Sequence, residues 1–314
     1  MRGRAAGDGD VALDVLLEVR TGVGPARAAS RCRGSLRGSA FSTAAVVPRL
    51  GVLTPETPVD PPRRFHSFRG GKLAYTATLR DAAPTLLAVH GLPGSVRDFR
   101  WLESAVGEEV SFVRVELPGY GQSTRTTFRG ETIEHRAAAV VELARSLELE
   151  SVTLVGHSAG SVVCAHVARH HPELVEGCVF LAPPGLDAHY NHAAYRVLSI
   201  PLRSAPVRVL AAPLLRQLYR LAGFPSYLTD DERVFTLADA SVQDFGRYRD
   251  EVQALTQPLL VAWAADDRLI PEALSQRFAD ALGSATQLRF ETGGHNVQKT
   301  HAVEIADAIR GFST

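Results

Sequence analysis

Beyond about residue 63, the chain alternates short apolar runs with longer segments in which apolar residues recur every three to four positions. Short apolar runs bounded by turn residues are typical of buried strands, and the longer spacing is typical of helices with one buried face. Two of the runs flank Gly70-Gly71 and predict a β-hairpin. The predicted strands are 65–68, 73–78, 85–89, 112–115, 152–155, 177–181, 259–263 and 287–290, and the predicted helices are 131–147, 161–170, 271–282 and 302–312.

The alternation of strands and helices predicts an α/β fold with a mostly parallel central sheet flanked by helices. It is interrupted between residues 186 and 256, where aromatic residues and helix-like runs lie between prolines without a convincing strand. We interpret this segment as a helical cap inserted over the sheet. The core then comprises residues 64–185 and 257–314.

The first 63 residues have a different composition, rich in Ala, Gly, Ser and Arg. No acidic residue occurs between Val19 and Pro55, and Arg-rich, Ser-rich, acid-poor sequence is typical of organelle transit peptides. Asp8 and Asp10, near the start, are atypical of such a peptide. A disordered extension and a transit peptide both remain open for residues 1–63, so the expected location is the cytoplasm or an organelle.

Composition and charge exclude several classes of partner. The 314 residues include 34 basic and 34 acidic side chains, and this zero net charge gives no indication of binding to nucleic acid. No apolar run approaches the roughly 20 residues that span a bilayer, so we expect a soluble protein without a transmembrane segment. Cys32, Cys164 and Cys178 lack the spacing of a metal site or a disulfide framework, which favours a reducing, intracellular compartment. Nothing in the sequence indicates the oligomeric state.

The most informative motif is a G-x-S-x-G formed by Gly156, Ser158 and Gly160 between a predicted strand and a predicted helix. A serine at the tip of such a tight turn stands clear of the sheet as a nucleophile, and small neighbours avoid clashes there. The helix N-terminus and the Ala159 N–H would face an oxyanion. His157 is adjacent, but we expect it to be packed or hydrogen-bonded rather than catalytic.

A second glycine-rich turn, His90-Gly91-Leu92-Pro93-Gly94, follows the strand 85–89. Its glycines would let the backbone fold so that the Leu92 N–H faces the same pocket as Ser158. Leu92 and Ala159 are therefore the candidate oxyanion-hole donors, since two such amides stabilise a tetrahedral intermediate. His90 is expected to brace this loop rather than to carry a proton.

A general base acting on Ser158 needs a carboxylate that fixes its tautomer and stabilises the imidazolium. The strand 259–263 is followed by Asp266 and Asp267, and Asp267 lies in Asp-x-Leu-Ile-Pro just before a helix that starts with proline. We prefer Asp267 as the acid, with Asp266 as the main alternative and Asp187 as a further candidate.

The base itself is expected in the loop after the last strand, where His295 follows Gly293-Gly294. The two glycines would let this loop approach Ser158. His301 lies on the following helix and is expected to face solvent.

Together these motifs resemble the α/β-hydrolase superfamily over about residues 64–313. The segment Glu116-Leu117-Pro118-Gly119-Tyr120-Gly121-Gln122-Ser123 adds to the likeness, with Glu116 in place of the commoner aspartate and Ala264 in place of a common glycine. The resemblance implies a serine hydrolase that cleaves a carboxylic ester or a related acyl compound with a Ser158, His295 and Asp267 triad, without a metal or an organic cofactor. Serine rather than aspartate at the elbow argues against epoxide hydrolase or haloalkane dehalogenase activity.

The resemblance leaves the substrate open. A C–C bond hydrolase, thioesterase, lactonase or acyltransferase would use the same triad, and a hydrolase-like ligand receptor would keep the fold without turnover. The aromatic and leucine-rich character of the predicted cap indicates an apolar small-molecule acyl substrate.

Overall fold

The computed structural model describes residues 57–188, 192–221, 224, 226 and 228–312. These residues belong to the compact unit Pro55–Thr314. The predictions for residues 1–56, which include the extension or transit peptide and Cys32, lie outside the described residues. No helix in the described ranges combines the length and the apolar character needed to cross a membrane.

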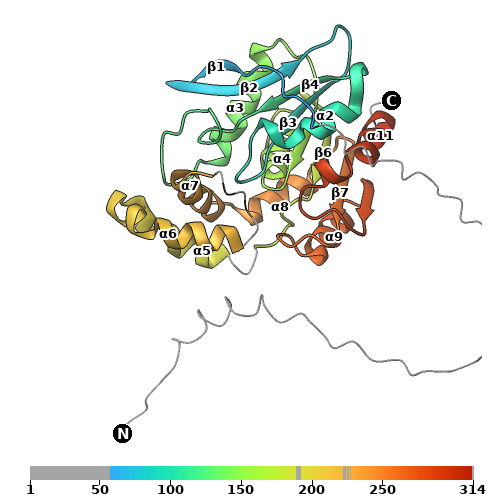
Figure 1. The fold of residues 1–314 in the computed structure, drawn as a ribbon. Coiled ribbons are helices and arrows are strands. Elements are labelled where there is room, and N and C mark those ends of the chain that lie inside the picture. The colour runs from blue at the N-terminus through green and yellow to red at the C-terminus, as the bar shows by residue number, and fades with distance from the viewer. Residues whose placement is uncertain (1–56, 189–191, 222–223, 225, 227, 313–314) are drawn as a thin grey trace, which may run out of the picture. The chain divides into compact units, whose positions relative to one another are not determined.

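Eight strands form one sheet in the order β1-β2-β4-β3-β5-β6-β7-β8 (Figure 1). β1 pairs antiparallel with β2, and β2 pairs antiparallel with β4, whereas the other neighbouring strands pair in parallel. The mostly parallel α/β sheet is therefore confirmed, and the predicted hairpin forms as β1 and β2. The strands are β1 (Arg64–Phe68), β2 (Gly71–Thr78), β3 (Thr85–Val89), β4 (Ser111–Val115), β5 (Val152–His157), β6 (Val175–Leu181), β7 (Leu259–Ala264) and β8 (Thr286–Phe290).

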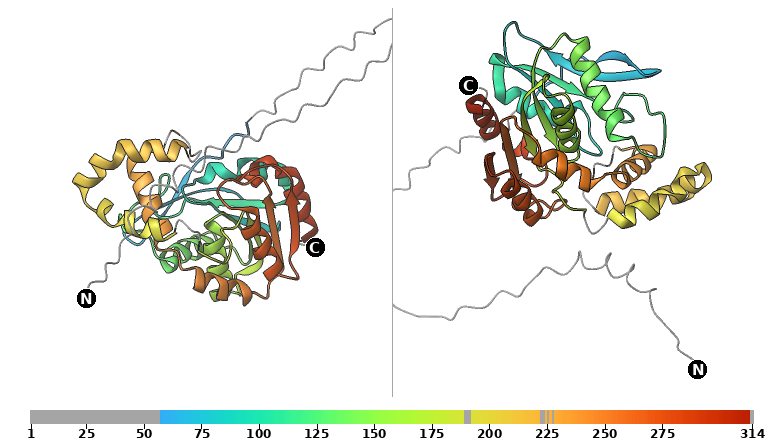
Figure 2. Two further views of the ribbon diagram at one scale, coloured as in Figure 1. Left: turned by 90° about the horizontal axis from the view of Figure 1, so that it is seen from below. Right: turned by 180° about the vertical axis from the view of Figure 1, so that it is seen from behind.

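Alternate residues of the central strands point into two separate hydrophobic clusters, one on each face of the sheet. Leu87 and Val89 of β3 belong to the cluster covered by α3, α4, α8 and α9, and Leu86 and Ala88 belong to the cluster covered by α2 and α11. The two helical layers can be followed in Figure 2. These helices are α2 (Arg100–Val106), α3 (Ile133–Ser146), α4 (Gly160–His170), α8 (Phe245–Gln253), α9 (Glu272–Ala281) and α11 (Ala302–Phe312), with the short α10 (Val297–Thr300) before α11.

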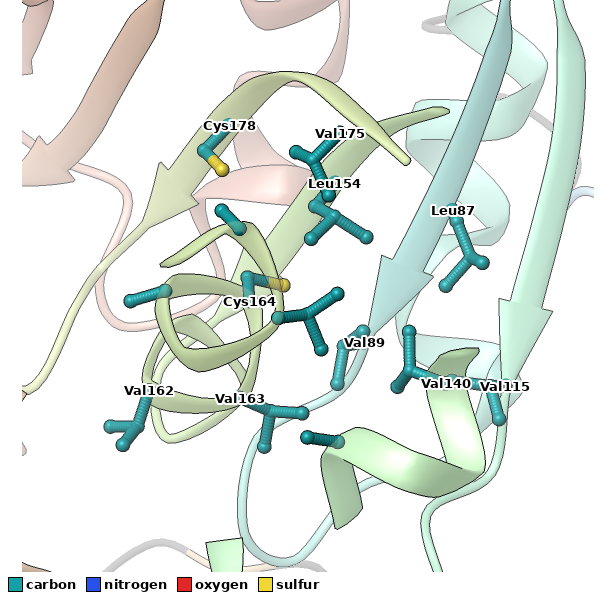
Figure 3. Close-up of a cluster of buried hydrophobic side chains, with 14 of the residues drawn as sticks. Leu87, Val89, Val115, Val140, Leu154, Val162, Val163, Cys164, Val175 and Cys178 are labelled. Carbon is teal, nitrogen blue, oxygen red and sulfur yellow. The ribbon is translucent and has the colours of Figure 1, made fainter. Parts of the chain in front are cut away.

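The cluster beneath α3 and α4 contains the two described cysteines (Figure 3). Cys164 on α4 and Cys178 on β6 are fully buried and carry free thiols. Burial raises the pKa of both thiols well above the usual range, so they stay uncharged. The expectation that Cys164 and Cys178 are small core residues is confirmed.

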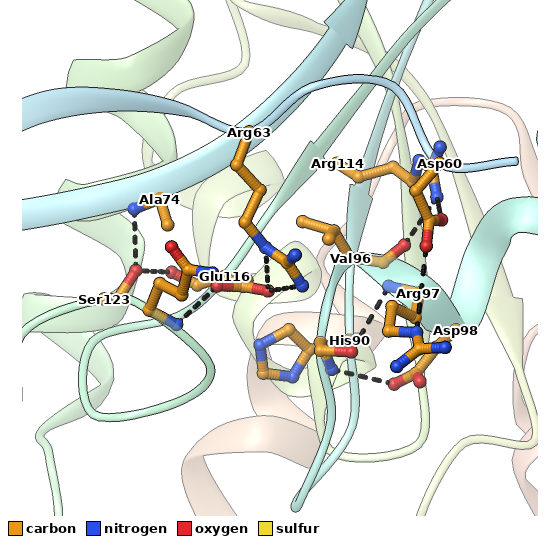
Figure 4. Close-up of polar contacts among 12 residues, drawn as sticks. Asp60, Arg63, Ala74, His90, Val96, Arg97, Asp98, Arg114, Glu116 and Ser123 are labelled. Carbon is orange, nitrogen blue, oxygen red and sulfur yellow. Dashed lines mark hydrogen bonds and ion pairs between the residues drawn. The ribbon is translucent and has the colours of Figure 1, made fainter.

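The residues just before β1 are held to the core by ion pairs (Figure 4). Asp60 contacts Arg100 and the buried Arg114 with N–O distances of 2.8 Å, and Arg63 contacts the buried Glu116 at 3.0 Å. A buried charge left without a counterion is strongly destabilising, so these contacts fix the chain that precedes the sheet. The core therefore includes Asp60 and Arg63, a few residues earlier than the predicted boundary at 64.

The segment between β6 and β7 contains helices and, within its described residues, no strand. α5 (His192–Ser199) and α6 (Ala205–Leu221) pack on α7 (Asp230–Ser241). α8 instead packs on α4 and supplies Tyr248 and Val252 to the main hydrophobic cluster. α8 is thus part of a core layer, although the predicted cap extends to residue 256.

α7 is joined to the core through the fully buried carboxylate of Asp239. Asp239 Oδ2 accepts a hydrogen bond from the Tyr120 hydroxyl at 2.8 Å, and Oδ1 accepts one from the Glu131 amide at 2.7 Å. Arg136 forms an ion pair with the same carboxylate. Burial raises the pKa of Asp239, and the charge of Arg136 opposes that effect.

Candidate active site

The carboxyl ends of β3 and β5 lie at the point where the order in which strands are added to the sheet reverses. From β3 the chain crosses to β4 on one side, and β5 to β8 are added on the other side. In open α/β sheets, ligands bind outside the carboxyl ends of the strands at such a switch point. Gly91 follows β3 and Ser158 follows β5, so the two glycine-rich motifs meet at this position.

The turn at Ser158 is strained and tightly packed. Ser158 has a left-handed backbone with φ of 51°, which is unfavourable for a residue with a side chain. Its carbonyl oxygen accepts a hydrogen bond from the Ser161 amide at 2.9 Å. A Cβ on Gly160 would lie 2.2 Å from the Val89 carbonyl oxygen, and one on Gly156 would lie 2.7 Å from Ser161 Cα. Helix α4 can begin directly behind Ser158 because both positions are glycine.

The loop after β3 lies against Ser158. A Cβ on Gly91 would be 2.9 Å from Ser158 Cβ. His90 is fully buried, and its Nδ1–H donates to the Gly91 carbonyl oxygen at 2.7 Å while its Nε2 accepts from the Leu117 amide at 3.0 Å. Burial lowers the pKa of His90 to about 4, so the ring is neutral near pH 7. The expectation that His90 braces this loop is confirmed.

Leu92 and Ala159 flank the contact between Gly91 and Ser158. Leu92 follows Gly91, and its side chain packs against the hydrophobic core. Ala159 follows Ser158 and is the N-cap residue of α4. Neither amide N–H donates a hydrogen bond to any residue of the described chain.

His295 lies in the loop after β8, and Asp267 lies in the loop after β7. Both strands are on the side of β5 opposite β3. His295 Nδ1 lies 2.7 Å from Asp267 Oδ2. Asp267 Oδ1 accepts hydrogen bonds from the amides of Leu269 at 2.8 Å and Ile270 at 3.1 Å. Burial raises the pKa of Asp267, but the hydrogen bond and charge of His295 and the two amides outweigh it and hold the pKa below its usual value.

The two alternative acids occupy other positions. Asp266 is exposed and accepts a hydrogen bond from the Gly294 amide at 2.7 Å, which fixes the loop that carries His295. Asp187 forms ion pairs with Arg249 and Arg277. Of the three carboxylates considered, the structure brings only Asp267 to the His295 ring.

His157 also contacts His295. Its Nε2–H donates to the His295 carbonyl oxygen at 2.9 Å, and the two rings lie 4.9 Å apart. Burial, with a smaller effect from the His295 charge, lowers the pKa of His157 to about 3. His157 is hydrogen-bonded, as expected, but the sequence did not indicate that its partner would be the His295 loop.

Ser158 Oγ makes no hydrogen bond to the His295 ring or to any other described side chain. Ser158 is partly exposed, and the His295 side chain is 13% exposed, so both face accessible space. Catalytic hydrogen bonds are often long in structures without substrate and shorten when the substrate binds.

His301 was expected to face solvent, and this prediction is wrong. Its ring stacks on Phe290 with a centroid distance of 3.8 Å, and its Nε2–H donates to the Thr292 carbonyl oxygen at 2.7 Å. The stacking is possible because the chain turns back between β8 and α11, so that His301 covers the end of the strand.

One group of described side chains has the arrangement of metal ligands, and it lies away from Ser158. It comprises His166 and His170 on α4 and Glu251 on α8. No metal site was predicted from the sequence. The available signal was the four-residue spacing of two histidines on the predicted helix 161–170, whereas Glu251 is distant in sequence.

Comparison with known proteins agrees with this architecture. The model of the Alpha/beta hydrolase family matches residues 86–308. The uncharacterized hydrolase YugF of Bacillus subtilis is 22% identical over 273 residues, which cover 81% of this chain and 98% of that protein.

Two solved structures show a similar fold. Carboxylesterase CesB (YbfK) from Bacillus subtilis aligns with a TM-score of 0.61 and 18% identity over 82% of this chain and 93% of that chain. Haloalkane dehalogenase DbeA from Bradyrhizobium elkani aligns with a TM-score of 0.64 and 23% identity over 80% of this chain and 98% of that chain. The family model spans most of the sheet and both loops described above, and the chain therefore belongs to the alpha/beta hydrolase family.

Proposed function

We propose that this protein is a serine hydrolase that cleaves a carboxylic ester or a related acyl compound. The observation that carries the proposal is the 2.7 Å contact between His295 Nδ1 and Asp267 Oδ2, at the sheet edge where the strained turn presents Ser158. The hydrolase name of the YugF relative and the carboxylesterase fold of CesB support the same reaction class.

In the first half-reaction, Ser158 Oγ attacks the substrate carbonyl carbon while His295 Nε2 takes the hydroxyl proton. Asp267, whose low pKa keeps it ionised, orients the ring and stabilises the imidazolium. The tetrahedral intermediate collapses when His295 gives its proton to the leaving alkoxide, which departs as an alcohol. Ser158 is left as an acyl ester.

In the second half-reaction, His295 takes a proton from water as the water oxygen attacks the acyl carbon. Collapse of the new tetrahedral intermediate releases the carboxylic acid and returns the proton to Ser158 Oγ. The reaction consumes one water and needs no metal or organic cofactor.

The amides of Leu92 and Ala159 are the proposed oxyanion hole. Both follow residues that are in contact, Gly91 and Ser158, and neither amide is used by the described chain. Amides fixed in this way stabilise charge that develops on the carbonyl oxygen, and each contributes about 3 kcal/mol to lowering the barrier. The N-terminus of α4 adds a favourable field at the same point.

A fluorophosphonate probe, which reacts with an activated serine, tests this proposal. The wild type should be labelled and Ser158→Ala should not, whereas Ser284→Ala, which changes an exposed serine, should be labelled like the wild type. An absence of wild-type labelling, or equal labelling of Ser158→Ala, would contradict the proposal.

A panel of esters and thioesters of different chain length, extended to lactones and to diketones cleaved at a C–C bond, identifies the acyl class. We expect apolar carboxylic esters to give the highest kcat/KM. A preference for another member of the panel would retain the Ser158 mechanism and replace the ester assignment.

A further inference from the structure

A histidine pair on α4 and a glutamate on α8 converge on one point outside the proposed active site. His166 and His170 are four residues apart and lie on the same side of the helix. His166 Nδ1 is 2.7 Å from Glu251 Oε1, and His170 Nε2 is 3.3 Å from the same oxygen. One ligand atom from each residue lies within 4.8 Å of the other two.

The second carboxylate oxygen of Glu251 is the unusual feature of this cluster. The Glu251 side chain is only 8% exposed, and its Oε2 is buried without a hydrogen-bond partner. Buried polar atoms in native proteins nearly always have a partner, and an unpaired one is costly. A carboxylate that only joined two histidines would have no reason to keep Oε2 buried and unpaired.

The surroundings of the cluster are open to an incoming ion. An open pocket of about 790 Å³ is lined by all three residues. Its other walls include the carboxylates of Glu134, Asp244 and Asp250, and the half-exposed His170 ring lies at the solvent boundary. Arg169 and Arg247 also line this pocket, and Arg247 forms an ion pair with Glu134. The lining carboxylates therefore outnumber the arginines by a small margin, and the case for a cation rests on the three converging side chains.

We propose that His166, His170 and Glu251 bind a divalent transition-metal ion of the Zn²⁺ type. Two imidazoles and one carboxylate suit such an ion, whereas Ca²⁺ and Mg²⁺ prefer oxygen ligands. Bonds of about 2.0–2.1 Å at tetrahedral angles separate neighbouring ligand atoms by about 3.3 Å. The two separations from Glu251 Oε1, 2.7 and 3.3 Å, do not exceed this value, and all three ligand atoms lie within 4.8 Å of one another. Small side-chain movements therefore admit the ion, and water completes the coordination.

This site has a structural role. The ion would join α4, which begins beside Ser158, to α8, which ends the inserted segment. His166 is eight residues along the helix from Ser158, which corresponds to about 12 Å at 1.5 Å per residue. The metal therefore stabilises the packing of the two helices and does not contact the reacting atoms.

Calorimetric titration of the tag-free full chain with Zn²⁺ and visible spectra with Co²⁺ test this site. We expect one ion per chain, tetrahedral Co²⁺ absorption, and a Tm increase of roughly 5 °C when free Zn²⁺ exceeds Kd about 100-fold. His170→Ala and Glu251→Gln should each weaken binding at least 10-fold and abolish the Tm shift. The matched control His171→Ala removes a neighbouring imidazole outside the cluster and should bind like the wild type.

Absence of binding by the wild type at millimolar Zn²⁺ would overturn the proposal. So would unchanged Co²⁺ spectra in His170→Ala, because the ion would then be bound elsewhere, for example at His295. His170 is half-exposed, so this variant should fold even if Glu251→Gln does not.

The outer surface of α5 and α6 combines basic and exposed apolar side chains. Residues 192–221 contain five arginines and no acidic residue. The exposed side of α6 carries an apolar stripe at Val207, Leu210, Leu214 and Leu221, with spacings of three, four and seven residues. Leu210 is 83% exposed, and Val197, Leu198 and Ile200 of the preceding segment are also exposed.

The arginines on these helices are largely free of counterions. Arg216 forms an ion pair with Asp230, whereas Arg196, Arg203, Arg208 and Arg220 have no carboxylate partner among the described residues. Apolar side chains beside uncompensated arginines are the composition of helices that lie in the interface of an anionic lipid layer. Figure 1 shows α5 and α6 at the outer side of the inserted segment, where α7 separates them from the sheet.

We propose that the α5–α6 surface binds anionic lipid membranes. The apolar stripe would enter the boundary between headgroups and acyl chains, and the arginines would contact the lipid phosphates. Each basic residue near an anionic surface strengthens membrane binding by about fivefold, so several arginines must act together.

Co-sedimentation with lipid vesicles tests this surface. The wild type should bind phosphatidylcholine vesicles that contain phosphatidylglycerol at least 10-fold more tightly than phosphatidylcholine alone, and binding should weaken with salt. Leu210→Ser with Leu214→Ser, and separately Arg203→Glu with Arg220→Glu, should each lose most of the binding. Val303→Ser removes an apolar residue of α11 that is about as exposed as Leu214, and this variant should bind normally.

Equal or no binding to the two vesicle types would overturn the lipid assignment. A wild-type dimer in solution that Leu210→Ser with Leu214→Ser converts to monomer would also overturn it, because a second copy of the chain would then cover the surface.

Discussion

His157 donates a hydrogen bond from Nε2 to the carbonyl oxygen of His295, at 2.9 Å. The bond joins the last residue of β5 to the loop that carries the proposed base. The low pKa of His157, about 3, keeps its ring neutral, so this contact persists at every pH at which a hydrolase with a histidine base would work.

Removing this contact should affect turnover more than substrate binding. We expect His157→Ala to lower kcat about 10- to 100-fold with little change in KM, because a displacement of about 1 Å at the base is enough for such a loss. His157→Gln keeps an N–H donor and should recover part of the loss. Steady-state kinetics on the best ester give the comparison, and a wild-type kcat in His157→Ala would contradict the positioning role.

The two neighbouring aspartates should differ in their effect on catalysis. Asp267→Asn leaves His295 Nδ1 facing an amide and is expected to lower kcat by about 10⁴-fold, because the ring adopts the wrong tautomer. Asp266→Asn can still accept the Gly294 hydrogen bond and should lose less than 10-fold. Equal losses of kcat in the two variants would contradict the assignment of Asp267 as the acid and of Asp266 as a residue that only fixes the loop.

Gly160 should be intolerant of even one added methyl group. In Gly160→Ala, Cβ would lie 2.2 Å from the Val89 carbonyl oxygen, and backbone cannot move aside as a side chain can. We expect a loss of about 1–3 kcal/mol or more in the free energy of unfolding. Gly283→Ala is the matched control, since its Cβ would meet nothing within 4 Å. Urea denaturation of both variants measures the difference.

Stability should fall as the pH decreases from about 6.5 towards 4. Burial lowers the pKa of His90 to about 4 and of His157 to about 3, from 6.5, so the unfolded chain binds two protons near pH 5 that the folded chain does not. Burial raises the pKa of Asp98 to about 6, so the folded chain binds one proton that the unfolded chain does not. The net difference of about one proton lowers the free energy of unfolding by about 1.4 kcal/mol per pH unit.

The His90→Gln variant checks this assignment. It should be less stable than the wild type at pH 7.5, because it replaces a fully buried ring, but its stability should change less between pH 6.5 and 5. Urea midpoints at several pH values give both slopes. Parallel slopes in the two proteins would show that His90 is not the source of the pH dependence.

The elements that depend on local pattern could be predicted from the sequence. The run 85–89 matches β3 because a short, continuous apolar run is typical of a strand buried on both faces. The helix 302–312 matches α11 because its apolar residues recur with the helical period. α2 was missed, since its seven residues are too few to show a helical period. The pairing of β1 with β2 followed from Gly70-Gly71, whereas the order of the parallel strands depends on contacts between distant segments.

The candidate site divides in the same way. The sequence placed Ser158, Asp267 and His295 next to the ends of predicted strands, which is local information. Contacts between loops are not local, so the His157 link to His295 and the stacking of His301 on Phe290 could not be read from spacing. Glu251 is 81 residues from His170, and only the packing of α8 on α4 brings them together.

Asp239 makes the inserted helices inseparable from the core. Deleting the insertion would leave the Tyr120 hydroxyl, the Glu131 amide and the buried Arg136 without their shared acceptor inside the protein. Replacing the segment with one that lacks a carboxylate at this position should therefore destabilise the core. We expect the central amides of α7 to exchange with solvent deuterium as slowly as those of the sheet, because opening of α7 would break the buried contacts of Asp239 with the core.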